Sequence, residues 1–323
     1  MTSNMTFSNG VILDRGSLDN ADLDFDCLNS LVDNWQSYDH TNVDDTLSRV
    51  KNAEVIISNK VIIDKTILEQ ASRLKLVCIA ATGTNNVDLV TAKNQGIRVC
   101  NVTGYATNSV VQHVFSLIFI LHRKICQYDA LVRNKKWDES KHFCRLDYPI
   151  TELTGKTLGI IGYGELGKAV AKAAEAFGLK VIIAQSLTNK KKNDRVELAD
   201  LFSQSDIISI HCPLTSDTEQ LINQQSLALM KPECILINTS RGGVINEKDL
   251  LDALKNNTLA AAGLDVLNQE PPEGNILTEA NLHNLIITPH IAWASHTSRQ
   301  RLVNEIGENI KAYLSNTKRN IVA

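Results

Sequence analysis

Three residues in the C-terminal half of the chain, Arg241, Glu270 and His290, have side chains suited to chemistry on a carboxylic acid. Each follows an apolar run typical of a buried strand, and these runs cover residues 234–238, 260–264 and 285–288. The carboxyl ends of parallel strands lie along one edge of a sheet, so the three side chains can meet there. Arginine can bind a carboxylate bidentately and polarise the neighbouring carbonyl, and histidine can supply a proton. A glutamate bonded to the histidine would stabilise the imidazolium, so the set fits reduction of a 2-oxo acid by a nicotinamide.

Each of the three residues also has an ordinary structural interpretation. Arg241 could cap a loop, Glu270 could be a surface charge before a Pro-Pro turn, and His290 could be a buried structural histidine. Their joint occurrence at three strand ends of one sheet favours the catalytic interpretation.

A glycine-rich turn would bring a cofactor to the same edge. Gly162, Gly164 and Gly167 follow a short apolar strand at 158–162 and open a helical pattern. The first glycine permits the tight turn, the second lets a pyrophosphate approach the backbone, and the third lets the helix pack on the strand. The phosphates would then lie on free N–H groups at the positive end of the helix. The motif predicts dinucleotide binding, with a purely structural glycine turn as the alternative.

The next strand, at 180–184, ends without the acidic residue that would bind the ribose 2′-hydroxyl of NAD. Gln185 stands there instead, and it can bond a ribose hydroxyl but does not repel a 2′-phosphate as aspartate would. Lys190, Lys191 and Lys192 lie just downstream. They are interpreted either as a solvated basic loop or as a sign that NADP(H) is tolerated.

The strand at 206–210 continues into His211, Cys212 and Pro213. Pro213 ends the strand at the sheet edge where an adenine ring would lie. His211 is expected to be structural rather than catalytic, because it belongs to the adenosine end of the site.

The composition limits the class of protein. The 323 residues suffice for two domains, and the 43% hydrophobic and 21% charged residues are ordinary for a soluble protein. A net charge of −3 gives no electrostatic case for a nucleic acid or a membrane surface as partner. Seven cysteines without a C-x-x-C pair indicate a reducing cytoplasm, no disulfides and no metal site.

No segment is expected to enter a membrane. Residues 1–10 lack the basic and apolar regions of a signal peptide. The most apolar run, residues 114–121, is far shorter than the ~20 residues that a membrane span needs, so we expect a buried helix there.

Residues 11–104 alternate between strand and helix patterns, which predicts a parallel sheet with right-handed crossovers. The expected strands cover residues 11–13, 55–57, 76–79 and 99–101. The expected helices cover residues 22–32, 64–73 and 87–94. Asp64 is expected to be an N-cap and Gly96 a C-cap. The turn at 80–86 leaves the carboxyl end of a strand, where the ligands of such sheets collect.

Residues 107–136 form one long helical pattern, which is expected to link two domains, and a loop is expected over 137–153. A second alternating block has strands at 158–162, 180–184, 206–210, 234–238, 260–264 and 285–288. A final helix at 295–315 is expected to return to the first domain.

The expected fold class is therefore α/β, with two doubly wound parallel-sheet domains. A Rossmann-type NAD(P)-binding domain, residues 105–294, is expected to be inserted in a flavodoxin-like substrate domain. That substrate domain would consist of residues 1–104 and 295–323.

Four motifs carry a resemblance to a known family, and they are Gly162-Tyr163-Gly164-Glu165-Leu166-Gly167, Asn238-Thr239-Ser240-Arg241-Gly242, Leu264-Asp265-Val266 with Glu270-Pro271, and Thr288-Pro289-His290. With these motifs the chain resembles the NAD-dependent D-2-hydroxyacid dehydrogenase family over nearly its whole length. It is most similar to the glycerate dehydrogenase (hydroxypyruvate reductase) branch, and that similarity rests on residues 13–16, 59–61, 81–88, 111–113 and 290–295.

The resemblance implies roles for individual residues. Arg241, Glu270 and His290 would be the catalytic residues, and backbone N–H groups around Thr82 and Gly83 would grip the substrate carboxylate. Trp293 would line the substrate pocket, with core packing as the alternative. The implied cofactor-binding residues are Thr107, Gly162, Gly164, Glu165, Leu166, Gly167, Gln185, Cys212, Pro213, Thr218, Thr239 and Asp265.

Two of these cofactor contacts have a more definite implied place. Asp265 would lie near the nicotinamide carboxamide, and Thr107 near the cofactor phosphate or the nicotinamide ribose. The family also implies a homodimer formed largely through the cofactor domain, for which the helix at 107–136 is a candidate contact.

The expected reaction is reversible hydride transfer between NAD(P)H and a small 2-oxo acid, giving the D-2-hydroxy acid. Hydroxypyruvate is the first expected substrate and glyoxylate the second. One alternative is another dehydrogenase of the same group, acting on phosphoglycerate, formate or a longer 2-oxo acid. The other is a non-catalytic NAD-sensing binding protein, such as a corepressor on this fold.

Overall fold

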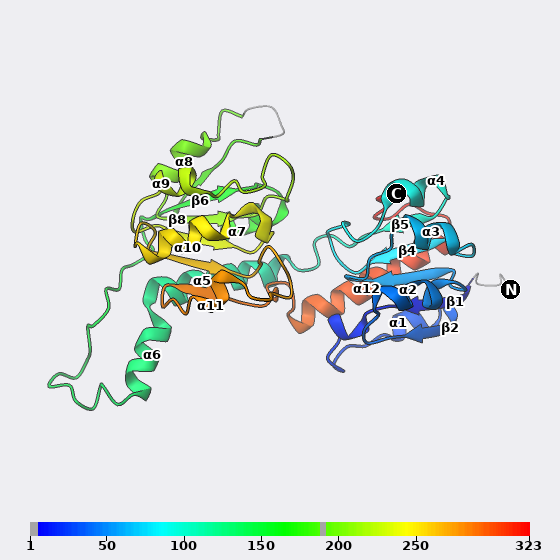
Figure 1. Cartoon of the computed structure of the whole chain (residues 1–323), viewed down its shortest axis with the longest axis horizontal. Helices are drawn as coiled ribbons and strands as arrows, with labels where there is room; N and C mark the ends of the chain where they lie inside the picture. Colours follow the sequence, from blue (N-terminus) through cyan, green and yellow to red (C-terminus); the bar gives the residue numbers. More distant parts are fainter. Residues whose placement is uncertain (1–5, 188–191) are drawn as a thin grey trace. The chain divides into compact units, whose positions relative to one another are not determined.

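The computed structural model describes residues 6–187 and 192–323, so Lys190 and Lys191 lie outside the described residues. The chain divides into two compact units (Figure 1). The first unit contains Met1–Ala106 and Trp293–Ala323, and the second contains Thr107–Ala292. The second unit is thus inserted within the sequence of the first.

The first unit is built on a five-stranded parallel sheet in the order β2-β1-β3-β4-β5. The strands are β1 Phe7–Ile12, β2 Val32–Ser37, β3 Val55–Ser58, β4 Leu76–Ile79 and β5 Arg98–Cys100. Every residue of β3 and β4 is buried, as expected for central strands covered on both faces. This is the flavodoxin-like strand order, and it confirms the fold class predicted for this part of the chain.

Helices surround this sheet, and they are α1 Asp26–Asn29, α2 Val43–Val50, α3 Lys65–Gln70, α4 Leu89–Asn94 and α12 His296–Leu314. The Asp64 carboxylate accepts the N–H of Ile67 at 2.9 Å, which confirms Asp64 as the N-cap of α3. Gly96 follows α4 with a left-handed φ of 70°, the conformation for which glycine is favoured after a helix.

The helix predicted over residues 22–32 is wrong. Only the four residues of α1 are helical, and the chain then continues into the edge strand β2. The Asp19 carboxylate accepts the N–H groups of Asp22 and Leu23 at 3.0 and 3.1 Å, so a side chain replaces the partners that a helix would provide. Helix α2 was not predicted at all.

The second unit is built on a six-stranded parallel sheet in the order β11-β10-β9-β8-β6-β7. The strands are β6 Thr157–Ile161, β7 Lys180–Ile183, β8 Ile207–Ile210, β9 Ile235–Asn238, β10 Ala261–Leu264 and β11 Leu285–Ile287. All six strands were predicted within one residue at each end. The helices are α5 Thr107–Arg123, α6 Ile125–Arg133, α7 Glu165–Ala176, α8 Leu198–Gln204, α9 Gln224–Ala228, α10 Glu247–Lys255 and α11 Ile276–Glu279.

A single residue extends this sheet beyond β7. Val196 forms an isolated parallel bridge with Ala184, and its N–H donates to the carbonyl of Ile183 at 2.9 Å. If Val196 is counted as a one-residue third strand, the order becomes 3-2-1-4-5-6-7, which is the Rossmann arrangement with one further strand. The order reverses between β6 and β8, beside the glycine turn.

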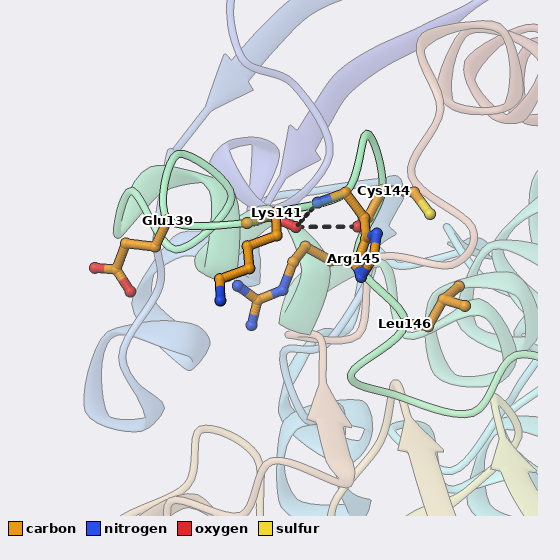
Figure 2. A pocket seen from close by; sticks show the side chains of 7 residues that line it. Glu139, Lys141, Cys144, Arg145 and Leu146 are labelled. Atoms are coloured by element: carbon orange, nitrogen blue, oxygen red, sulfur yellow. Dashed lines mark hydrogen bonds between the residues drawn. The ribbon is translucent and has the colours of Figure 1, made fainter.

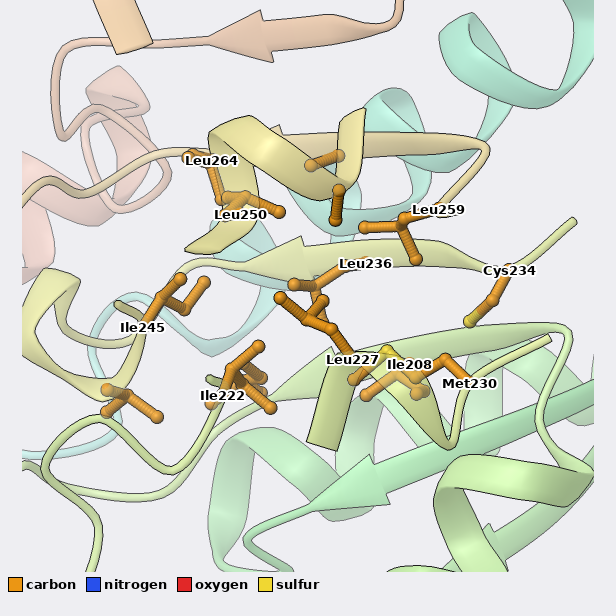
Figure 3. Packing of buried hydrophobic residues seen from close by; sticks show 14 of the residues in the cluster. Ile208, Ile222, Leu227, Met230, Cys234, Leu236, Ile245, Leu250, Leu259 and Leu264 are labelled. Carbon is orange, nitrogen blue, oxygen red and sulfur yellow. The ribbon is translucent and has the colours of Figure 1, made fainter. Parts of the chain in front are cut away.

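The core of the second unit is aliphatic (Figure 3). Ile208 and Leu236 on the sheet pack with Leu227 of α9 and Leu250 of α10, and three of these four side chains are wholly buried. Each such side chain stabilises the fold by roughly 1.5–3 kcal/mol when it leaves water. The packing fixes the strands whose carboxyl ends carry the candidate functional residues.

The single helix predicted over residues 107–136 is wrong in its extent. Lys124 adopts a left-handed φ of 55°, and the chain bends by 59° there between α5 and α6. No single described helix is long and apolar enough to cross a membrane, and α5 with α6 would meet that criterion only as a bent pair. The loop predicted over 137–153 is confirmed, because this described segment contains neither helix nor strand.

Candidate active site

Arg241, Glu270 and His290 come together at the carboxyl edge of the second unit's sheet. Strands β9, β10 and β11 are neighbours there, paired in parallel. All three residues line one cavity of about 190 Å³. Its other lining residues are Leu214, Gly242, Gly243, Val266, Leu267 and Asn268. The structure therefore brings together the three side chains that were predicted from the strand ends to meet at one edge of the sheet.

His290 and Glu270 form a close hydrogen bond in this cavity. The Nδ1 of His290 lies 2.6 Å from Oε2 of Glu270, and since a carboxylate only accepts, Nδ1 is the donor. The second carboxylate oxygen accepts the backbone N–H of Leu267 at 3.0 Å, which orients the glutamate. The pair is accessible, with exposed side-chain fractions of 28% for His290 and 35% for Glu270. Because Nδ1 is bonded to Glu270, Nε2 is the ring nitrogen that would exchange a proton with a substrate.

Arg241 lies in a turn fixed by its own neighbours. Asn238, the last residue of β9, donates from Nδ2 to the carbonyl of Arg241 at 2.9 Å and accepts the N–H of Ser240 at 3.0 Å. A Cβ on Gly242 would lie 2.0 Å from the carbonyl carbon of Leu267, so only glycine allows this approach. The close contact brings the Arg241 turn against the segment that carries Glu270.

Asp265 holds the loop that carries His290. Its side chain is 1% exposed and accepts the hydroxyl of Thr288 and the N–H groups of Ile291 and Ala292, the last two at 2.9 and 2.7 Å. The hydroxyl of Thr288 gives its one proton to Asp265. The Nε2 of His113, 2.9 Å from the same hydroxyl oxygen, is therefore the donor in that contact. From the sequence, Asp265 was predicted only to contact the cofactor, and no role was predicted for Thr288 or His113. The polar Thr288 directly before Pro289 was the available signal.

The glycine turn has the geometry that its motif predicts. Gly162 has φ 94°, and a Cβ there would lie 2.4 Å from the backbone nitrogen of Cys212. A Cβ on Gly167 would lie 2.1 Å from the carbonyl oxygen of Gly162, so helix α7 packs closely on the turn. Gly164, the N-cap of α7, has nothing within 4 Å of its added Cβ. The backbone at Gly164, directly before Glu165 and Leu166, is therefore open to a ligand at the positive end of α7.

Two threonines flank this cofactor site. The hydroxyl of Thr107, at the start of α5, donates to the Glu165 carboxylate. Thr239, which follows β9, is only 9% exposed, and its hydroxyl has no hydrogen-bond partner in the described structure. A buried hydroxyl without a partner fits a site that a polar ligand completes. The glycine cradle and this hydroxyl are thus compatible with a bound dinucleotide.

Gln185 has both ends of its amide occupied. Its Nε2 donates to the carbonyls of Lys192 and Arg195 at 2.8 and 3.3 Å, and its Oε1 accepts the N–H of Lys192 at 3.0 Å. The resemblance implied that Gln185 contacts the cofactor. In the structure its amide instead closes the loop after β7.

The adenosine side contains residues that are held by the fold. Thr218 donates to the carbonyl of Pro213 at 2.7 Å and accepts the N–H of Thr215 at 2.8 Å, which closes the turn after β8. Burial lowers the pKa of His211 to about 4, and its Nε2 lies 2.8 Å from the hydroxyl of Ser209. A histidine that is neutral at pH 7 and bonded to its own strand agrees with the structural role predicted for it.

The remaining substrate candidates belong to the first unit. Thr82 follows β4, and its hydroxyl donates to the carbonyl of Val102 at 2.8 Å, which secures the turn containing Gly83. Trp293 packs edge-on against Tyr105, with ring centroids 6.3 Å apart. Their roles toward a substrate stay predictions.

No metal site is found in the described ranges, since they contain no group of three His, Cys, Asp or Glu side chains that could hold an ion. All seven cysteines are free thiols. Burial raises the pKa of Cys212 to about 11 and that of Cys234 to about 12, so both stay protonated at neutral pH.

Comparison with known proteins extends these observations. The pattern of the family described as D-isomer specific 2-hydroxyacid dehydrogenase, NAD binding domain, matches residues 115–292. The chain is 44% identical over 314 residues to a glycerate dehydrogenase of Methylorubrum extorquens, with 97% of this chain and 98% of that protein covered. It is 40% identical over 320 residues to a hydroxypyruvate reductase of Blautia hydrogenotrophica, with the same coverage of 97% and 98%.

The fold is also that of a solved relative. An acyclic imino acid reductase, solved in complex with NADPH and D-Arg, matches with a TM-score of 0.85 and 31% sequence identity. The match covers 98% of this chain and 100% of that one. The two-domain α/β architecture predicted for the chain is therefore confirmed, and residues 115–292 belong to the part that binds the nicotinamide cofactor.

The contrast between two glycines of the turn predicts two different defects. Gly167→Ala should lower the free energy of unfolding by about 1–3 kcal/mol, because the new methyl group forces α7 away from Gly162. Gly164→Ala should cost about 1 kcal/mol or less but weaken NADH binding, because the second glycine admits the pyrophosphate. Urea unfolding and titration with NADH would measure both. Equal losses of stability in the two variants would contradict this account of the turn.

Proposed function

Because the chain belongs to the D-isomer specific 2-hydroxyacid dehydrogenase family, we propose that it reduces hydroxypyruvate to D-glycerate, with glyoxylate as a second substrate. It is an oxidoreductase that transfers a hydride between a nicotinamide cofactor and a small 2-hydroxy acid or its 2-oxo acid. The observation that carries the proposal is the His290–Glu270 hydrogen bond of 2.6 Å, in a cavity that Arg241 also lines.

The chain's own residues bind the acid and move the proton. When bound, the nicotinamide supplies the hydride to the carbonyl carbon. Arg241 pairs with the substrate carboxylate and polarises the adjacent carbonyl. His290 donates its Nε2 proton to the carbonyl oxygen, which becomes the hydroxyl group, while Glu270 holds Nδ1 and stabilises the imidazolium. In oxidation, the same Nε2 accepts the proton of the hydroxyl group.

The choice of substrate is supported by the relatives that span the whole chain. One is named a glycerate dehydrogenase and another a hydroxypyruvate reductase, and these names describe the two directions of one conversion. Both align with 97% of this chain, so the similarity includes the first unit, which holds Thr82 and Trp293.

A substrate panel tests the proposal directly. Oxidation of NADH by the purified chain would be measured with hydroxypyruvate, glyoxylate, pyruvate and 3-phosphohydroxypyruvate. We expect the highest kcat/KM with hydroxypyruvate and lower but measurable turnover with glyoxylate. Turnover with only pyruvate or the phosphorylated acid would keep the chemistry and reject the substrate. Tight NADH binding with no turnover on any acid would favour a cofactor-sensing protein.

Substitutions at the histidine–glutamate pair test the proton transfer. His290→Ala should lower kcat by about 10²-fold or more, the usual contribution of positioned acid–base catalysis. Glu270→Gln keeps the size of the side chain but removes its charge, so kcat should fall by roughly tenfold or more through loss of imidazolium stabilisation. His283→Ala, at an exposed histidine of the same unit, is the matched control and should leave kcat unchanged. Near-normal turnover of the His290 variant would remove that residue from the mechanism.

We also propose that the chain forms a homodimer through α6 and the loop that follows it. These elements run away from the sheet of their own unit (Figure 1). Within the loop Phe143 and Leu146 are 91% and 84% exposed, although it is held by bonds such as that from Trp137 Nε1 to the carbonyl of Phe143 at 3.1 Å. An ordered loop with large exposed apolar side chains is typical of a protein interface.

The same loop folds around a hollow of about 420 Å³ (Figure 2). Its lining includes residues 139–142 and 144–146, and Ser140 accepts the N–H of His142 and donates to the carbonyl of Cys144. We assign this region to assembly because the loop that encloses the hollow also presents the exposed Phe143 and Leu146.

Charges placed on this loop should separate the subunits. Phe143→Asp combined with Leu146→Asp should reduce the mass measured by light scattering from about twice the 35.7 kDa of one chain to a single copy, because burying the new carboxylates is unfavourable. Val43→Asp, at a position of α2 that is 79% exposed, is the matched control and should leave the mass unchanged. A mass of one copy for the wild-type chain would contradict the proposed dimer.

A cytoplasmic location completes the proposal. Its support is the set of seven cysteines, all of which are free thiols as expected of a reducing compartment.

A further inference from the structure

We propose that Arg195 forms a binding site for the 2′-phosphate of NADP(H), so that this chain takes NADPH as a reductant beside NADH. The inference rests on the cofactor site of the proposed function and adds the residue that would decide the choice of cofactor. It follows from how the end of β7, the loop after it and the glycine turn are connected.

The end of β7 lacks the group that would select NAD. A carboxylate after this strand would bind the ribose hydroxyls and repel a phosphate on the 2′ oxygen. Gln185 stands at this position and is neutral, and both ends of its amide are used by the backbone of Lys192 and Arg195. The strand end therefore offers no negative charge, and its side chain is committed to shaping the loop.

The same hydrogen bonds place Arg195 beside the strand end. Gln185 binds the carbonyl of Arg195 through its side chain and the carbonyl of Val196 through its backbone N–H, the latter at 2.8 Å. Val196 in turn bridges to Ala184 on the outer side of β7. The backbone of Arg195 is thus fixed at the third-strand position of the sheet, one strand beyond β7.

The side chain of Arg195 reaches back to the glycine turn. Its guanidinium carbon lies 5.7 Å from the ring centroid of Tyr163, which stands between Gly162 and Gly164 in that turn. One end of the residue lies outside β7 and the other lies beside the turn after β6, so the side chain passes the carboxyl end of β7. A dinucleotide held on the glycine turn places its adenosine ribose at that strand end.

The guanidinium is available for an anion. Its Nε is buried without a hydrogen-bond partner, and no carboxylate pairs with Arg195 in residues 6–187 and 192–323. A cation–π contact with the Tyr163 ring restrains the planar group while leaving its N–H edge able to donate. A phosphate dianion accepts such donors in bidentate geometry from the terminal guanidinium nitrogens and balances the charge of Arg195.

Binding of nucleotide fragments tests this site without any turnover. Calorimetry on the full chain would compare 2′,5′-ADP with 5′-AMP, which differ by the 2′-phosphate. We expect 2′,5′-ADP to bind roughly 10- to 100-fold more tightly, the scale of charge-assisted hydrogen bonds. In Arg195→Gln that advantage should fall below about threefold. Equal binding of the two fragments by the wild-type chain, or an unchanged advantage in the variant, would overturn the proposal.

Two further variants keep the result interpretable. Arg195→Lys retains the charge but lacks the planar fork and Nε, so its 2′,5′-ADP advantage should lie between those of the wild type and Arg195→Gln. If Arg195→Gln does not fold, the 2′,5′-ADP advantage of Arg195→Lys decides whether the site exists. Lys180→Gln removes an exposed charge from the opposite end of β7 and should retain the full advantage. A loss as large in Lys180→Gln as in Arg195→Gln would indicate a general charge effect and reject the site.

Kinetics separate this proposal from the proposed function. The ratio of kcat/KM with NADPH to kcat/KM with NADH should fall about tenfold or more in Arg195→Gln. Preferential binding of 2′,5′-ADP by a chain that reduces no 2-oxo acid would reject the function and keep the site. Reduction of hydroxypyruvate with NADH, by a chain that binds both fragments equally, would reject the site and keep the function.

Discussion

One buried carboxylate holds the candidate active site together. Asp265 directly follows β10, is 1% exposed, and binds the hydroxyl of Thr288 and the backbone N–H groups of Ile291 and Ala292. His290 lies between these partners with φ at 54°, a conformation that residues other than glycine seldom adopt. A buried carboxylate is stable only when its oxygens are bonded, so strand and loop are held to each other. The direction of the His290 ring follows from that constraint.

The two carboxylates of the site differ in environment and therefore in what they can do. Asp265 is enclosed, and its bonds to Thr288 and the loop backbone leave it a fixed part of the fold. Glu270 is 35% exposed, and it accepts hydrogen bonds from the backbone N–H of Leu267 and from Nδ1 of His290. Glu270 is bonded to the proton-transferring ring, so it can stabilise a change in the charge of that ring. Asp265 thus supports the loop, and Glu270 supports the proton transfer.

Much of the site could be predicted because strand ends in a parallel sheet share an edge. Apolar runs marked the six strands of the second unit, and residues that follow β8, β9, β10 and β11 line the cavity. Local pattern failed where side chains compete with the backbone, as at Asp19, which takes the donors of a helix that was predicted and is absent. It failed again at Lys124, where α5 ends without a glycine or proline to signal the break. It also could not supply the partners of Asp265, which lie 23 to 27 residues further along the chain, or those of Gln185, which depend on the path of the loop after β7.

The insertion of the second unit has a consequence for synthesis on the ribosome. The first 106 residues include all five strands of the first sheet, yet α12 and the last residues of the chain complete that unit. The carbonyl of Ala323 accepts the N–H of Val99 in β5, and Ile306 and Ile310 of α12 are buried. The first unit therefore waits, incomplete, while 186 residues of the second emerge and can fold behind it. The unit that leaves the ribosome first is the last to be finished.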